Sequence, residues 1–187
     1  MRIVAGLHKG RRLEAPAGRD TRPTADRVRQ ALFDILMHSD LVEMEGARVV
    51  DAFAGSGALG LEALSRGAAH ACFLELAAQP LAAIYANVKA LKVEGQTKVV
   101  RADAAKPPAA PHACTLAFLD PPYHSGLAAP CLEGLAAKGW LEDGALAVVE
   151  VAADEAFTPP AGFDAVEERP RGAARLVFLV YNLENRG

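Results

Sequence analysis

A glycine-rich run, GSGALG at residues 55–60, stands between a short apolar segment and a segment of small residues and leucine. The apolar segment, RVVD at residues 48–51, is typical of a buried strand, and residues 59–66 are typical of a helix. A strand that leads directly into a helix is the first unit of a sheet with helical crossovers. The G-x-G-x-x-G spacing at this place also indicates a site for an adenosine-containing ligand.

The rest of the chain continues the alternation of strands and helices. A helix is predicted to begin with Pro80 at its first position and to have an apolar face through Leu91. Another helix is predicted over residues 127–138, and strands are predicted over residues 71–76, 98–101, 115–119, 145–151, 163–168 and 175–183. The last two strands have no helix of useful length between them, so we expect an antiparallel pair. The sequence therefore predicts a Rossmann-like α/β fold with a mostly parallel seven-stranded sheet, a C-terminal antiparallel strand and helices on both faces.

The N-terminal part has a different pattern. Residues 2–5 and 11–15 are predicted to be two short strands of a basic hairpin around Lys9-Gly10, followed by a loop at 18–23. Thr24 is predicted to cap a helix that extends to about His38. Its apolar face is formed by Val28, Ala31, Leu32, Ile35 and Leu36, which leaves Arg27 and Arg29 off that face.

Charge is divided unevenly along the chain. The 187 residues carry a net charge of −3, but residues 1–30 hold eight Lys and Arg against three Asp and Glu. The first thirty residues therefore carry +5, and the remaining 157 carry −8. A basic arm on an acidic body predicts that the arm meets a polyanion such as nucleic acid. We expect two parts, a basic hairpin and helix at residues 1–44 and a sheet domain at residues 45–187.

Several classes of protein are disfavoured. No apolar run approaches the about 18 residues that a membrane helix needs, and the apolar stretch at the N-terminus is too short for a signal peptide. The three cysteines, Cys72, Cys114 and Cys131, show no C-x-x-C spacing, and the five histidines form no H-x-x-x-H pair. We therefore expect a cytoplasmic protein with reduced thiols and no metal, and nothing in the sequence demands more than a monomer.

Acidic residues stand at the ends of the first four predicted strands of the sheet, namely Asp51, Glu75, Asp103 and Asp120. Ligands of such sheets bind at the carboxyl ends of the strands, near the point where strand order reverses. Glu75 is placed to accept hydrogen bonds from ribose hydroxyls, and Asp103 from the adenine amino group. Asp51 would repel a pyrophosphate but attract the ammonium group of S-adenosylmethionine. Each acid taken alone is also explained as a cap or a solvated loop residue, but the set favours S-adenosylmethionine.

The turn Asp120-Pro121-Pro122-Tyr123 follows the predicted strand at 115–119. The prolines stiffen the turn and keep Asp120 out of the helical region. The Asp120 carboxylate and the Pro121 carbonyl can accept two hydrogen bonds from an exocyclic NH₂ group, which leaves the nitrogen lone pair available to attack. Tyr123 offers a flat face for a base that has left its stack. These four residues are the predicted catalytic site, although a proline-rich turn with a packed tyrosine explains the motif taken alone.

Specific motifs occur together along almost the whole chain. They are RIVAG, KGRRL, RPTADRVRQALFDIL, VVDAFAGSGALGLEALSRGA, FLE, RADA, LAFLDPPY and GWL. With these motifs the chain resembles the bacterial 16S ribosomal RNA guanine-N2 methyltransferases of the RsmD type, and the RPT-x-DRVR-x-ALF stretch is the most specific of them. The resemblance implies a class I methyltransferase fold, S-adenosylmethionine as cofactor, and methylation of one guanine N2 in 16S rRNA, within an assembling or assembled 30S subunit or as free RNA.

The resemblance also implies roles for individual residues. The turn at Asp120 to Tyr123 would hold the target guanine. Cofactor binding is implied for Asp51, Phe53, Ala54, Gly55, Ser56, Gly57, Glu75, Leu76, Asp103 and Ala104. Contact with rRNA is implied for Arg11, Arg12, Arg22, Thr24 and Arg27.

Three other functions fit parts of the sequence. An Asp-Pro-Pro-Tyr turn also serves adenine-N6 methylation of DNA or RNA. The glycine run also fits an NAD(P)-dependent oxidoreductase. The basic arm fits a non-catalytic RNA-binding protein that has kept the fold. The identity of the methylated nucleoside, the binding of NAD(P) and the effect of Asp120→Ala distinguish these functions.

Overall fold

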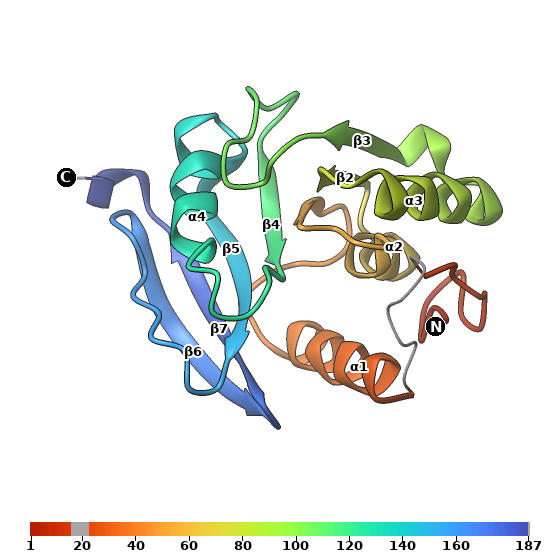
Figure 1. Ribbon diagram of the computed structural model, residues 1–187, viewed down its shortest axis with the longest axis horizontal. Helices are drawn as coiled ribbons and strands as arrows, with labels where there is room; N and C mark the ends of the chain where they lie inside the picture. Colours follow the sequence, from red (N-terminus) through yellow and green to blue (C-terminus); the bar gives the residue numbers. More distant parts are fainter. Residues whose placement is uncertain (16–22, 187) are drawn as a thin grey trace.

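A computed structural model describes residues 1–15 and 23–186 of the chain (Figure 1). Its strands are β1 (Arg48–Ala52), β2 (His70–Glu75), β3 (Thr97–Arg101), β4 (Cys114–Leu119), β5 (Leu141–Ala152), β6 (Phe163–Arg171) and β7 (Ala174–Tyr181). Its helices are α1 (Pro23–His38), α2 (Ala58–Ser65), α3 (Ala78–Leu91) and α4 (Ala128–Ala137), with short 3₁₀ helices at Glu94–Gln96 and Leu183–Arg186. None of the described helices combines the length and the apolar character that a membrane span requires.

The seven strands form one sheet in the order β3-β2-β1-β4-β5-β7-β6. The pairs from β3 to β5 are parallel, whereas β7 is antiparallel to both β5 and β6. β7 is therefore the reversed strand, and the predicted mostly parallel sheet with a C-terminal antiparallel strand is confirmed. The chain runs outward from β1 to β3 and then returns to β4 beside β1. Strand order thus reverses between β1 and β4, where ligands of α/β sheets bind.

Helices cover both faces of the sheet, as predicted. On one face Leu61 of α2 and Ile84 of α3 join a core that includes Phe73 of β2 and residues of α1. On the other face Leu132 of α4 packs in a second core with Leu119 of β4. Figure 1 shows α4 well separated from α1, α2 and α3. Successive strand residues point to opposite faces, which is why β1 to β5 and β7 each supply both cores.

The N-terminal segment folds back on itself as predicted, but its two arms are too short to count as regular strands. Ile3 N–H donates to the Arg11 carbonyl at 2.9 Å, Leu13 N–H donates to the Met1 carbonyl at 3.0 Å, and one antiparallel bridge joins Arg2 and Arg12 within the described residues. The backbone N–H groups of Val4 and Ala5 donate instead to the carboxylate of Glu62 on α2, at 2.9 and 3.0 Å. Figure 1 shows this segment beside α2. The short hairpin is therefore also bonded to α2, because Val4 and Ala5 donate to Glu62 and do not continue the pairing with the second arm.

Glu62 joins three parts of the structure from a fully buried position. Besides the N-terminal backbone, its carboxylate accepts hydrogen bonds from Nε of Arg66 at 2.8 Å and from Nε of Arg29 on α1 at 3.4 Å. Arg29 is itself buried, so the prediction that it lies off the buried face of the helix is wrong. The periodicity of apolar residues misses it because a charged side chain is buried here with its counter-charge. Arg27 is exposed, as predicted.

Two helices begin at other residues than predicted. α1 begins at Pro23, so Thr24 lies inside the helix rather than at its N-cap, and most of the loop predicted at 18–23 lies outside the described residues. α3 begins at Ala78, which places Pro80 at the third helical position rather than the first. Proline is tolerated there because the first four N–H groups of a helix have no intrahelical partner.

We expect Glu62→Ala to lower the free energy of unfolding by about 3–5 kcal/mol, because it removes the partner of buried Arg29 and of two backbone N–H groups. Urea unfolding followed by circular dichroism measures this loss. The control is Glu142→Ala, which removes a half-exposed partner of Arg48 and should cost about 1 kcal/mol or less. Equal losses in the two variants would contradict the role assigned to Glu62.

Candidate functional site

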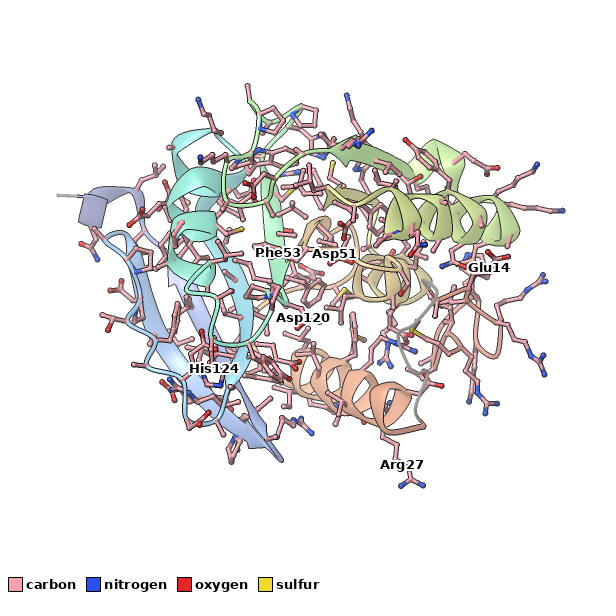
Figure 2. The ribbon with its side chains drawn as sticks, in the orientation of Figure 1. Glu14, Arg27, Asp51, Phe53, Asp120 and His124 are labelled. Carbon is pink, nitrogen blue, oxygen red and sulfur yellow. The ribbon has the colours of Figure 1, made fainter. Side chains whose placement is uncertain are left out.

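Four acidic residues predicted from the strand ends meet at the carboxyl edge of the sheet. Asp51 lies in β1, Glu75 ends β2, Asp103 follows β3 and Asp120 follows β4. Figure 2 shows Asp51 and Asp120 close to each other, with Phe53 beside them, in the middle of the molecule. This edge includes the reversal point between β1 and β4. The structure therefore brings the predicted cofactor and target residues to one place.

Two of these carboxylates hold the glycine loop. Oε2 of Glu75 accepts the N–H of Gly55, and Oδ2 of Asp51 accepts the N–H of Gly60, both at 2.9 Å. Dinucleotide sites use the N–H groups of such a loop and the following helix to bind a pyrophosphate. Here two of these donors already bond to carboxyl groups of the chain itself. A pyrophosphate at this loop would find these two N–H groups occupied and would meet the Glu75 carboxylate, which argues against the oxidoreductase alternative.

The loop's backbone needs its glycines. Gly57 has a φ of 76°, in the left-handed region that side chains disfavour. At Gly60, an added Cβ would lie 2.5 Å from Cε1 of Phe73, so the glycine lets α2 approach β2 closely. Ala54 and Ser56, the two residues that flank Gly55, are buried. Phe53 also has a positive φ, 59°, an uncommon conformation for a bulky residue that is found mainly at functional sites.

A pocket of about 280 Å³ opens beside the loop, between the carboxyl ends of β1, β2 and β3 and the turn after β4. The predicted residues that line it are Phe53, Glu75, Leu76, Asp103, Ala104 and Pro122. It is also lined by Leu74, Ala102 and Leu127, which sequence reasoning missed because apolar side chains near a strand end carry no distinguishing signal. Mostly apolar walls with a few acceptors suit the adenosine part of a ligand.

Glu75 and Asp103 are fixed by short local hydrogen bonds. Oε1 of Glu75 accepts the N–H groups of Leu76 and Ala77, both at 2.9 Å. Oδ1 of Asp103 accepts the N–H of Ala105 at 2.9 Å, so this exposed carboxylate also caps the turn that follows β3. Both side chains therefore have defined positions at the pocket before any ligand binds.

The Asp120-Pro121-Pro122-Tyr123 turn lies at the other side of the pocket. Asp120, Pro122 and Tyr123 are exposed, whereas Pro121 is buried and anchors the turn. The hydroxyl of Tyr123 donates to Oε1 of Glu150 at 2.6 Å. Partial burial and this carboxylate raise the pKa of Tyr123 well above its ordinary value, so the phenol stays protonated. Sequence reasoning missed Glu150, although an acid inside the apolar run of β5, next to β4, was the available signal.

Helix α1 borders the target side of the site. A small cavity of about 30 Å³ is lined by Val28 and Leu32 of α1 together with Asp120 and Glu150. The helix therefore forms one wall beside the Asp120 turn, although it is far from the glycine loop in sequence.

The predicted nucleic-acid residues lie on the N-terminal segment and α1. Arg11, Arg12 and Arg27 are exposed, and Figure 2 shows Arg27 extending away from the body of the molecule. Arg12 and Arg27 line a surface cavity of about 600 Å³ together with Arg2. Arg22 and the side chain of Thr24 lie outside the described residues.

The fold and the site together define a Rossmann-like class I methyltransferase. This class is recognised by the order of the strands in the sheet, by the single reversed strand β7 and by the glycine loop after β1. A solved SAM-dependent methyltransferase from Thiobacillus denitrificans, in complex with S-adenosyl-L-homocysteine, matches with a TM-score of 0.56 and 23% identity, over 72% of this chain and 51% of that chain. At this identity the likeness shows the fold alone.

Closer relatives show the family. The family model described as "Conserved hypothetical protein 95" matches residues 1–180. "Ribosomal RNA small subunit methyltransferase D" of Escherichia coli K12 is 36% identical, over 100% of this chain and 92% of that protein. The protein of the same name from Haemophilus influenzae is also 36% identical, over 92% of this chain and 89% of that protein. The solved structure of a hypothetical protein of Thermus thermophilus, TTHA0928, matches with a TM-score of 0.74 and 33% identity. The match covers 95% of this chain and 98% of that chain.

The chain belongs to this family of small-subunit ribosomal RNA methyltransferase D proteins. The resemblance found in the sequence is thereby confirmed.

Burial raises the pKa of Asp51 from 3.8 to about 8; the Gly60 N–H lowers it, and Asp120 and Glu75 raise it further. A folded-state pKa above the unfolded value means that the folded chain holds a proton that the unfolded chain releases. We therefore expect the contribution of Asp51 to stability to be fully present below pH 3.8 and to be lost as pH rises through about 8.

Asp51→Asn tests this expectation, because asparagine keeps an acceptor for Gly60 but does not titrate. The free energy of unfolding, measured with urea across this pH window, should fall less with rising pH in the variant than in the wild type. Parallel profiles for the two proteins would contradict the raised pKa.

Proposed function

We propose that this chain transfers the methyl group of S-adenosylmethionine to the exocyclic N2 of a guanine in small-subunit (16S) ribosomal RNA. The observation that carries the proposal is that the Asp120 turn and the pocket at Phe53 and Glu75 adjoin each other, with Pro122 lining that pocket. The relatives named as small-subunit ribosomal RNA methyltransferases, which match the chain over almost its whole length, support the same substrate class.

The residues at the loop fit S-adenosylmethionine. This cofactor carries an ammonium and a sulfonium group and no phosphate, so it suits a loop whose N–H groups bond to Asp51 and Glu75. Asp103 and Ala104 would hold the adenine and Glu75 the ribose. Phe53 and the loop residues Gly55 to Gly57 would face the ribose and the amino-acid part. When bound, the cofactor supplies a methyl group on a sulfonium whose leaving group is a neutral thioether.

The Asp120 turn would position the target amino group. The Asp120 carboxylate and the Pro121 carbonyl accept its two N–H groups, which draws the nitrogen lone pair out of conjugation with the base. The nitrogen then attacks in line, forming the N–CH₃ bond as the S–CH₃ bond breaks, and the extra proton leaves to water. Positioning supplies most of the acceleration. Tyr123, held by Glu150, acts as a neutral stacking surface, because its raised pKa excludes it as a base.

Residues 1–44 would serve as the rRNA-binding extension and residues 45–187 as the methyltransferase domain. The exposed Arg11, Arg12 and Arg27 are placed to contact phosphates, while the acidic remainder of the chain would repel them. Because α1 borders Asp120, RNA bound along this surface would present a base to the turn. Flipping that base out of its stack brings it against Tyr123.

A methylation assay tests the proposed reaction. The purified protein, methyl-labelled S-adenosylmethionine and small-subunit rRNA or 30S particles that lack the modification should yield N2-methylguanosine on nucleoside analysis. Asp120→Ala should reduce the rate about 100-fold or more while sparing cofactor binding, because one of two positioning acceptors is lost. The control Asp154→Ala removes a highly exposed acid near the turn and should leave the rate unchanged. N6-methyladenosine as product, or cofactor binding with no methylated nucleoside, would overturn the proposal.

Replacing Arg11 and Arg12 by alanine should weaken rRNA binding. The slope of log K, the association constant for rRNA, against log salt concentration should become shallower by about 1 for each phosphate that the variant no longer neutralises. Cofactor affinity should not change. A matched double variant, Lys89→Ala with Lys138→Ala, removes two exposed cations from α3 and the end of α4 and should leave the slope as it is. A slope that is the same in wild type and the arginine variant would exclude this surface from rRNA binding.

A further inference from the structure

A cluster of metal-binding side chains lies outside the site described above. Among the described residues, His70, Cys72 and His112 place one potential ligand atom each within 4.8 Å of the others. His70 and Cys72 belong to the first half of β2, and His112 precedes β4. The cluster therefore lies at the amino-terminal edge of the sheet, opposite the edge that carries Asp51 and Asp120.

The distances in the cluster are close to those of a zinc site. Sγ of Cys72 lies 3.8 Å from Nδ1 of His70 and 3.9 Å from Nε2 of His112. Zinc bonds of about 2.3 Å to sulfur and 2.0–2.1 Å to nitrogen, at a tetrahedral angle, separate the two ligand atoms by about 3.6 Å. The two imidazole rings meet edge to face with centroids 4.6 Å apart. The sulfur–nitrogen pairs need shifts of a few tenths of an ångström, and the nitrogens of His70 and His112, which lie within 4.8 Å, would have to come to about 3.3 Å, which side-chain rotation of the two partly exposed histidines can supply.

The fold rather than the local sequence builds this cluster. His70 and Cys72 are two residues apart in a strand, so their side chains leave the same face of the sheet. β1 lies between β2 and β4, and the loop that precedes β4 brings His112 back to the start of β2. The ligands stand at positions 70, 72 and 112, which matches no contiguous metal motif, so the sequence alone predicted no metal.

We propose that His70, Cys72 and His112 bind a Zn²⁺ ion, with a water molecule as the fourth ligand. One thiolate and two imidazoles are a ligand set that zinc prefers, and three protein ligands leave one tetrahedral position for solvent. Binding replaces the proton of the Cys72 thiol by the Zn–S bond and releases that proton to the solvent, while both imidazoles bind in their neutral form.

Two features of the surroundings oppose binding and set its strength. Cys72 is fully buried, and burial raises the pKa of its thiol to about 11, so the ion must displace a tightly held proton. Lys98 pairs with Cys72 across β2 and β3 and is a nearby positive charge. Lys98 is exposed, however, so water and salt screen its repulsion. The bonds from three converging ligands offset the loss of the thiol proton and the repulsion by Lys98.

The ion would brace the start of β2 against the loop before β4. Because the cluster lies at the opposite edge of the sheet from the proposed methyl-transfer site, the ion would take no part in methyl transfer. Binding to the folded chain alone then raises the free energy of unfolding by RT ln(1 + [Zn²⁺]/Kd), so the melting temperature rises with the free Zn²⁺ concentration. Loss of zinc binding would leave the proposed methyl transfer intact, so the two proposals fail independently.

The test uses the full chain, reduced and stripped of metal with a chelator. Titration with Zn²⁺ against a chromophoric competitor should give one tight site per chain and an increase in the melting temperature. Co²⁺ as a probe should give the visible bands of a tetrahedral ion and a thiolate-to-metal charge-transfer band in the ultraviolet. Cys72→Ser and His112→Gln should each weaken Zn²⁺ binding by more than about 100-fold, since even the loss of an outer-shell partner costs about 10–100-fold.

Cys131→Ala is the matched control, because it removes a buried thiol of α4 that is not part of the cluster and should keep full binding. His112 is partly exposed in a loop, so its variant should retain the wild-type circular dichroism spectrum while it loses the metal. The proposal is overturned if the wild type gives no thiolate-to-Co²⁺ band. It is also overturned if the two cluster variants bind Zn²⁺ as tightly as Cys131→Ala does.

Discussion

The hydrogen bonds from the glycine loop to Asp51 and Glu75 are the constraint on which the rest of the site depends. They bind the loop to the ends of β1 and β2, and Asp51 accepts its bond while almost completely buried. The same bonds favour one ligand class, because they occupy N–H groups that a dinucleotide site offers to a pyrophosphate. A loop held in this way suits a cationic adenosine cofactor, and its shape also places Phe53 against the pocket.

A second set of buried polar contacts makes the N-terminal part continuous with the sheet domain. Glu62 joins the N-terminal backbone to α1 through Arg29, and buried Asn87 of α3 donates to the carbonyl oxygens of both Ser56 and Glu14. The segment that carries the exposed arginines is therefore anchored on α2 and α3, next to the glycine loop. This arrangement gives a physical reason for a substrate surface and a cofactor loop to keep a fixed relative position.

The sheet and most of the site could be predicted because their signals are local. Apolar runs mark the strands, and the acids after them mark the carboxyl edge, so Glu75, Asp103 and Asp120 were found without knowing the topology. The features that were missed depend on partners distant in sequence. Arg29 is buried with Glu62 as its partner, the N-terminal hairpin is also bonded to α2 through Val4 and Ala5, and Glu150 reaches Tyr123 because β5 lies beside β4.

The central claim is that the loop bonded to Asp51 and Glu75 selects an adenosyl cofactor without phosphate over a dinucleotide. Isothermal titration calorimetry of the wild-type chain with S-adenosylmethionine, S-adenosylhomocysteine, NAD and NADP measures this selection directly. The account predicts saturable binding of both adenosyl compounds and no measurable heat with either dinucleotide. Binding of NAD or NADP with an affinity equal to that of S-adenosylmethionine would contradict it.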